Sequence, residues 1–195
     1  MEKSHGMYMT LTIEVQDTDK KSKTKYVKKS DSFLSNWVRI FARSLTRSNY
    51  PEPPVSLGDG TPAFHNFGRW SANAAEDNDR RGILVGNGTD PLEFTDNLLS
   101  GWIRAVDGVV KYGQSFVFPP EVENGIVSIR YNRYFSGVSE ENFNLTETGI
   151  SIQHPGVPVT NNNFSLIVKD VFEPIIIIPG SMFIIEYKLS YHVHD

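Results

Sequence analysis

The chain contains no cysteine, which excludes disulfide bonds, thiolate nucleophiles and cysteine-ligated zinc sites. It also lacks a long hydrophobic run. The longest one, Ile175-Ile-Ile-Ile, ends at Pro179 and is far shorter than the ~20 apolar residues that cross a bilayer. The first residues show no apolar core of a signal peptide. We therefore expect a soluble protein that has no membrane span and is not classically secreted.

An excess of basic charge is absent as well, since 19 Lys and Arg face 23 Asp and Glu. The formal net charge of -4 and a pI of about 5.7 argue against nucleic acid as the main partner, since duplex-binding domains usually carry a basic stripe. The one basic run lies between Lys20 and Lys29. Its pattern favours a solvated hairpin or an edge strand protected by lysines; contact with phosphate or with an acidic protein surface are the alternatives.

What the chain does contain is alternation. Apolar residues occupy nearly every second position over residues 164–172, 183–193 and 9–15, and a period of two indicates β-strands with one buried face. Shorter strands are expected at residues 22–27, 82–86, 103–106, 109–112, 114–118, 126–135 and 145–153. Many short strands separated by turns predict a mainly β fold, an antiparallel β-sandwich of jelly-roll-like or Ig-like type, formed by residues 1–195 as a single domain.

One α-helix is expected, over residues 30–47. Ser30 or Asp31 provides an N-cap oxygen for the first turn, and apolar residues then recur at three- and four-residue spacing. This apolar face consists of Phe33, Leu34, Trp37, Val38, Phe41 and Leu45. A single helical turn is also expected at residues 96–102, ended by Gly101.

Residues 48–81 form a long irregular insertion that is rich in proline and glycine. Loops of this length are uncommon in compact domains and tend to be functional or disordered, and the aromatic content argues against simple disorder. We interpret the segment as an extended arm. It either folds back on its own domain or docks on a neighbouring subunit, and the predicted subunit-interface residues are Tyr50, Phe64, Phe67 and Trp70.

Motifs for catalysis or cofactor binding are not evident. Gly86-x-Gly88 resembles a phosphate loop, but Thr-Asp-Pro follows it rather than a helix or a lysine at the required spacing. His192 and His194 share a strand face but lack a third metal ligand. We therefore predict no catalytic residue, no cofactor and no metal. Glycan hydrolysis by an unrecognised carboxylate pair is the alternative enzyme hypothesis.

Glu147 is the one carboxylate with an unusual context. It lies in an alternating segment and is followed by Thr148 and Gly149. A glutamate there predicts a β-bulge or a buried, hydrogen-bonded carboxylate. We favour a structural role for Glu147 over a catalytic one.

Three groups of residues occur in a suggestive order. They are Gly82-Ile-Leu-Val-Gly-Asn-Gly-Thr-Asp-Pro with Asp96-Asn-Leu-Leu; Val127-Ser-Ile-Arg-Tyr-Asn-Arg-Tyr-Phe with Leu145-Thr-Glu-Thr-Gly-Ile150; and residues 164–172, 174–180 and the closing strand to Tyr191. In this order the chain resembles virion proteins of tailed bacteriophages, notably small β-rich tail and head–tail connector proteins. The resemblance covers residues 82–193, and the arm at 48–70 departs from it.

The resemblance implies a non-enzymatic β-sandwich that assembles as a homo-oligomeric ring or collar in the neck or tail of a virion formed in the host cytoplasm. Its partners would be copies of itself and other virion proteins. It carries no catalytic residue over to this chain. The alternative is a receptor- or carbohydrate-binding module of a tail fibre, in which Tyr8, Tyr50, Trp70 and Trp102 supply stacking surfaces.

Overall fold

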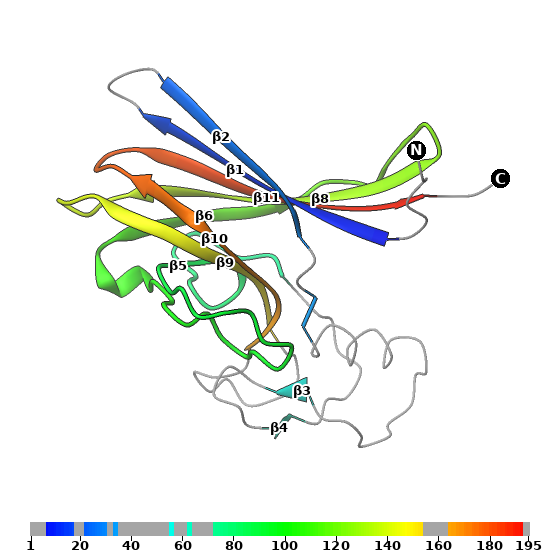
Figure 1. Cartoon of the computed structure of the whole chain (residues 1–195), viewed down its shortest axis with the longest axis horizontal. Coiled ribbons are helices and arrows are strands. Elements are labelled where there is room, and N and C mark those ends of the chain that lie inside the picture. The colour runs from blue at the N-terminus through cyan, green and yellow to red at the C-terminus, as the bar shows by residue number, and fades with distance from the viewer. Residues whose placement is uncertain are drawn as a thin grey trace.

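The computed structural model describes residues 7–17, 22–30, 33–34, 55–56, 62–63, 72–153 and 164–192 (Figure 1). Within these residues the protein is mainly β, and all strand pairs are antiparallel. The prediction of an antiparallel β protein is confirmed.

The larger sheet has the strand order β2-β1-β11-β8-β6, with β7 also paired to β8. Its strands are β1 (Met7–Asp17), β2 (Ser22–Ser30), β6 (Val110–Val117), β7 (Glu121–Glu123), β8 (Ile126–Gly137) and β11 (Met182–His192). The strands at either end of the chain are therefore neighbours in the middle of one sheet. The two strands expected at 109–112 and 114–118 form one continuous strand, β6. Its pairing with β8 has a register irregularity between Tyr112 and Ser115.

The smaller sheet has the order β10-β9-β5. Its strands are β5 (Gly82–Gly86), β9 (Phe143–Gln153) and β10 (Phe164–Ile177). A separate two-stranded hairpin joins β3 (Val55–Ser56) to β4 (Pro62–Ala63). The β10–β9 pairing shifts register between Val171 and Ile175. The β-bulge considered for Glu147 therefore lies not on its own strand but on β10, just past Val171, which pairs with Glu147.

The core lies between the two sheets, which Figure 1 shows side by side. Alternation places Leu11 and Ile13 of β1 on the inner face of the larger sheet, both fully buried. They belong to one hydrophobic cluster with residues of the smaller sheet such as Val168 and Ile150. The burial of these apolar side chains from both sheets is the main driving force for the fold.

Both faces of the smaller sheet are covered over much of their length, contrary to the expectation of one buried face. All residues from Phe164 to Asp170 are buried, Lys169 included. The reason is that residues 88–101 lie over the outer face of this sheet, where they contact Glu147 and Lys169. Residues 102 and 103 then pair with the edge of β5.

The predicted helix at 30–47 does not begin where expected. Ser30 is the last residue of β2, and its hydroxyl bonds to the Asp170 carboxylate at 2.7 Å instead of capping a helix. Phe33 forms an isolated bridge with Val168, and the Leu34 amide donates to the Ile167 carbonyl. This edge pairing satisfies the backbone in an extended conformation. The remainder of the predicted helix lies outside the described residues.

Two smaller expectations were also wrong. Residues 96–102 contain turns rather than a helical turn. The strand expected at 103–106 is replaced by a short 3-10 helix, η1 (Ala105–Asp107), in which the Asp107 carboxylate accepts a hydrogen bond from the Arg104 amide. Local capping by aspartate thus overrides the apolar character of this segment.

The lysine-rich run forms part of an edge strand, as predicted. Strand β2 ends the larger sheet. Lys23 and Lys25 lie 2.5 and 3.5 Å from the carboxylate of Glu14 on β1, and the hydrogen bond from Lys23 lowers the pKa of Glu14. Charged side chains on an edge strand discourage pairing with other chains.

Candidate functional site

The predicted interface residues Tyr50, Phe64, Phe67 and Trp70 lie outside the described residues, so their role stays a prediction. Among the described residues, acidic and histidine side chains form no group that would hold a metal ion. In that same part of the chain no helix is long and apolar enough to span a bilayer.

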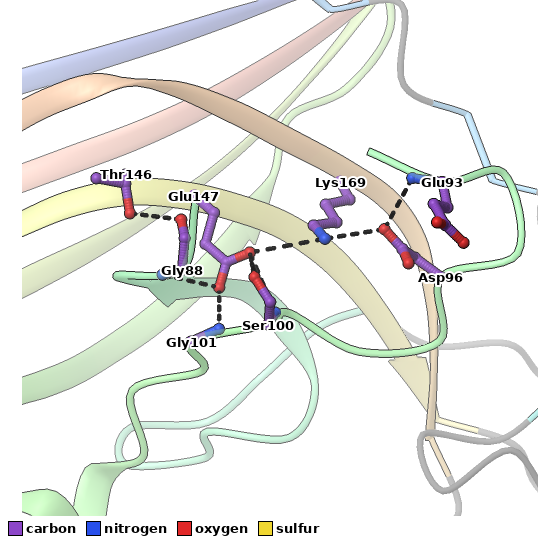
Figure 2. A network of polar contacts seen from close by, with 8 residues as sticks. All are labelled: Gly88, Glu93, Asp96, Ser100, Gly101, Thr146, Glu147 and Lys169. Atoms are coloured by element: carbon purple, nitrogen blue, oxygen red, sulfur yellow. Dashed lines mark hydrogen bonds and ion pairs between the residues drawn. The ribbon is translucent and has the colours of Figure 1, made fainter. Parts of the chain in front are cut away.

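Glu147 is a buried, hydrogen-bonded carboxylate, which confirms the prediction made from its context. Its side chain is fully buried on the outer face of the smaller sheet. Oε1 accepts hydrogen bonds from the amides of Gly88 and Gly101 at 3.3 and 2.5 Å, and Oε2 accepts from the amide and hydroxyl of Ser100 at 3.2 and 3.1 Å. Figure 2 shows these donors converging on one carboxylate. Hydrogen bonds to a charged acceptor are stronger than neutral ones.

The Gly86-x-Gly88 loop holds an anion, but the anion is the protein's own glutamate. A Cβ atom on Gly88 would lie 2.1 Å from the Ser100 hydroxyl oxygen, and one on Gly86 would lie 2.4 Å from Glu147 Oε1. Only glycine permits this close approach of backbone to carboxylate. The predicted strand is confirmed as β5, whereas residues 87–93 form neither a helix nor a regular turn; the loop is explained by packing around Glu147.

Lys169 extends the network toward Asp96. Its side chain is 2% exposed, and its Nζ lies 2.8 Å from Asp96 Oδ2 and 3.9 Å from Glu147 Oε2. Asp96 Oδ2 also accepts a hydrogen bond from the Glu93 amide at 3.1 Å. Figure 2 shows the ammonium group between the two carboxylates. Three charged groups from β9, β10 and the covering segment therefore meet at one place.

Sequence reasoning missed Lys169 and Asp96. Lys169 occupies a polar position of an alternating strand, which predicted a solvent-facing side chain. Asp96 lies in a segment without periodicity. The available signal was the proximity of the Asp96-Asn-Leu-Leu motif to the glycine loop, which does not reveal that the segment crosses the sheet.

Arg133 is a second buried charge, located between the sheets and fully buried. Its guanidinium group donates five hydrogen bonds to backbone carbonyls, at distances of 2.6 to 3.2 Å. The acceptors belong to Ala75, Asn78, Arg81, Ile83 and Gly113. The guanidinium carbon, Cζ, also lies 4.7 Å from the centre of the Tyr112 ring. This one side chain thus holds residues 75–83 against β6 and β8.

Burial shifts the pKa of several groups around Arg133. Desolvation lowers the pKa of Arg133 to about 10, which still leaves the guanidinium charged at neutral pH. Desolvation raises the pKa of Tyr131 to about 12 and raises that of Tyr112 as well. The Tyr131 hydroxyl donates to the Ala72 carbonyl, and the Tyr112 hydroxyl donates to the Ile103 carbonyl at 2.6 Å. These groups act as hydrogen-bonding anchors and not as proton carriers at neutral pH.

The outer face of the larger sheet carries a contiguous apolar patch, which we call the outer patch: Phe116, Tyr134, Met182 and Ile184. The Phe116 and Tyr134 rings contact each other with centroids 6.2 Å apart. Tyr134 pairs with Ile184 across β8 and β11, and both line a hollow of about 100 Å³ with Met182. The exposed fractions of Phe116, Tyr134 and Met182 are 44%, 39% and 45%.

A polar pocket of about 310 Å³ lies at the other end of the same face. It is lined by Tyr8, Thr10, Glu121, Glu123, Asn124, Ile126, Ser128, Lys188 and Ser190. The structure therefore brings Tyr8, one of the proposed stacking residues, next to carboxylates, hydroxyls and an ammonium group. Trp102 lies elsewhere: its ring packs on Phe164, and the Arg104 guanidinium covers it, so it is not a free stacking surface.

Comparisons with known proteins identify no relative. No family model, no curated protein and no solved structure matches the chain.

Proposed function

We propose that this protein is a non-enzymatic structural component of a tailed phage virion, and that its two sheets form a β-sandwich of jelly-roll-like or Ig-like type. It assembles as a multi-copy ring or collar in the neck or tail. The order of the three sequence segments described above supports the phage assignment. Two of the fully buried charges among the described residues, Glu147 and Arg133, are bound mainly by backbone groups of the chain itself, which suits a scaffold.

The observation that carries the assembly role is the outer patch. The outer face of an antiparallel sheet that faces water is normally polar, yet four neighbouring side chains on three strands are apolar here. Exposed apolar patches rimmed by polar residues mark interaction sites, and aromatic residues contribute strongly to interface energies. Contact with another copy would bury Phe116, Tyr134 and Met182 together.

Light scattering and negative-stain imaging of the purified full chain test this proposal. We expect a ring-like oligomer, and we expect Tyr134→Glu, in the centre of the outer patch, to shift it toward smaller species. Val106→Glu is the matched control, because Val106 is 76% exposed on η1 away from the patch. A monodisperse monomer with no affinity for virion components would contradict the assembly role.

A second candidate function is glycan or receptor binding by a tail-fibre module, and the polar pocket favours it. Pockets for small polar ligands combine a few directed polar groups with an aromatic surface, as Tyr8, Glu123 and Lys188 do here. A glycan-array screen tests this function. Binding that is reproducible and lost in Tyr8→Ala would favour it, whereas the absence of binding would favour the scaffold.

A further inference from the structure

The Glu147 network contains the components of an acyl-transfer reaction within the chain. Lys169 provides a primary amine, Asp96 provides a carboxyl carbon, and Glu147 provides a second carboxylate beside the amine. Lys169 and Glu147 are almost fully buried, and the Asp96 side chain is 21% exposed. The group lies beneath the segment that covers the smaller sheet, where water has little access to the amine.

The distances place the amine next to the carbon it would attack. Lys169 Nζ lies 2.8 Å from Asp96 Oδ2, and Cγ is one C–O bond of ~1.2 Å away from that oxygen. Holding reacting atoms close to contact distance converts a bimolecular step into an intramolecular one, with effective concentrations of about 10⁵ M or more. Rigid strands hold Lys169 and Glu147, and the hydrogen bond from Glu93 to the Asp96 carboxylate fixes the third group.

We propose that this protein forms an intramolecular isopeptide bond between Lys169 and Asp96, with Glu147 as the general base. The bond would fasten the segment around Asp96 covalently to β10. This proposal does not depend on the proposed virion role, because it concerns chemistry within a single folded chain.

The reaction balances without an external reagent. The reaction begins with the transfer of one proton from Nζ to Oδ2 along their hydrogen bond, which gives a neutral amine and a carboxylic acid. The Nζ lone pair attacks Cγ, and Glu147 Oε2 accepts a proton from the nitrogen. Glu147 then returns this proton to the departing hydroxyl, which leaves as water. An ammonium and a carboxylate are thus converted into an amide and one water molecule.

Two backbone features match the roles in this reaction. The Glu93 amide, 3.1 Å from Asp96 Oδ2, donates to the oxygen that is to leave as water, and this hydrogen bond fixes the orientation of the carboxyl group for attack at Cγ. The amides of Gly88, Ser100 and Gly101 keep the Glu147 carboxylate in a single orientation. Its Oε2 faces Lys169 at 3.9 Å, so the base needs only a small movement to contact the nitrogen.

The mass of the wild-type full chain tests the proposal directly. After both termini are assigned, we expect the folded protein to be lighter than its sequence by one water molecule. Peptide mapping should find the peptides containing Asp96 and Lys169 joined. The Lys111–Glu76 pair is an internal control: its N–O distance is also 2.8 Å, but both side chains are more than half exposed, and we expect no cross-link there.

Three variants separate the roles. Lys169→Arg keeps the cation but has no amine to acylate, so its mass should equal the full sequence. Asp96→Asn should form the same cross-linked peptide mass as wild type, because ammonia leaves in place of water. Glu147→Gln should retain the uncross-linked mass. Circular dichroism verifies that each variant is folded.

The wild-type measurement decides the outcome even where a variant does not fold. Folded wild-type protein that keeps the full sequence mass after prolonged incubation would overturn the isopeptide proposal and show Lys169 to be an ordinary ion-pair partner. Cross-linking that persists in folded Glu147→Gln would overturn the assignment of Glu147 as the base.

Discussion

Two irregular segments lie against the sheets, and each is held by one buried charge of opposite sign. Residues 75–83 direct carbonyl oxygens at the Arg133 guanidinium. Residues 88–101 direct amide N–H groups at the Glu147 carboxylate. The first segment is held by a cation and the second by an anion. Apart from the first two residues of β5, Gly82 and Ile83, neither segment forms a regular strand or helix.

The difference between the two anchors explains what each segment can do. Buried backbone groups outside regular structure need partners, and a multivalent charged side chain satisfies several at once. Around Arg133 the polar partners are mainly neutral carbonyls, so no acyl group is activated there. Beside Glu147 lie an amine and a second carboxylate. Only the second anchor therefore combines support for the backbone with reactive groups.

The largest effect is expected from Arg133→Met. A methionine fills much of the volume but leaves five carbonyls without their donor, and breaking a buried charged network typically costs about 3–5 kcal/mol. We expect a loss of this size in the free energy of unfolding, measured by urea denaturation, or no folded protein at all.

Arg130→Met is the matched control for Arg133. Arg130 lies on the same strand but on the outer face, where its side chain is 33% exposed and pairs with Glu121. Exposed ion pairs contribute at most about 1 kcal/mol. If the two variants were equally stable, Arg133 would not be the anchor of residues 75–83.

Most of the long strands and the buried carboxylate of Glu147 could be predicted from the sequence, but the Arg133 anchor could not. Alternation predicted the strand, and a glutamate followed by Thr148 and Gly149 within it indicated a β-bulge or a buried, hydrogen-bonded carboxylate. Arg133 lies in the run Tyr131-Asn-Arg-Tyr, where its carbonyl partners come from residues distant in sequence. Phe33 and Leu34 illustrate the opposite failure, because two adjacent apolar residues fit a helix face as well as the extended edge pairing that they adopt.

An intermediate effect is expected from Glu147→Gln. The NH2 group of glutamine replaces one acceptor oxygen and faces the amides of either Gly88 and Gly101 or Ser100. An unsatisfied buried group costs about 1–3 kcal/mol. Hydrogen exchange should accelerate at these amides, while the amides of residues 75–83 stay protected. Glu93→Gln is the control, since its side chain is exposed in the same segment. Equal acceleration in both segments would show that the two anchors are not independent.

The smallest effect at neutral pH is expected from Tyr131→Phe, which removes the hydroxyl that bonds to Ala72. One lost hydrogen bond of this kind costs about 1–2 kcal/mol, measured as a change in the free energy of unfolding. Ala72 lies just before residues 75–83, whose carbonyls Arg133 binds. This variant therefore tests how far the position of residues 75–83 also depends on the uncharged Tyr131 hydroxyl.

The pH dependence of Tyr131→Phe sharpens this test. The pKa of Tyr131 rises from 10.0 to about 12 on folding, so between these values the unfolded state loses its phenolic proton before the folded state does. Wild-type stability therefore falls as pH rises through this window, and phenylalanine is exempt from the loss. The advantage of wild type in the free energy of unfolding should therefore shrink as pH rises from 10 toward 12. A difference that stays constant would mean that Tyr131 titrates alike in both states, and that its hydroxyl is not shielded by the segment that Arg133 holds.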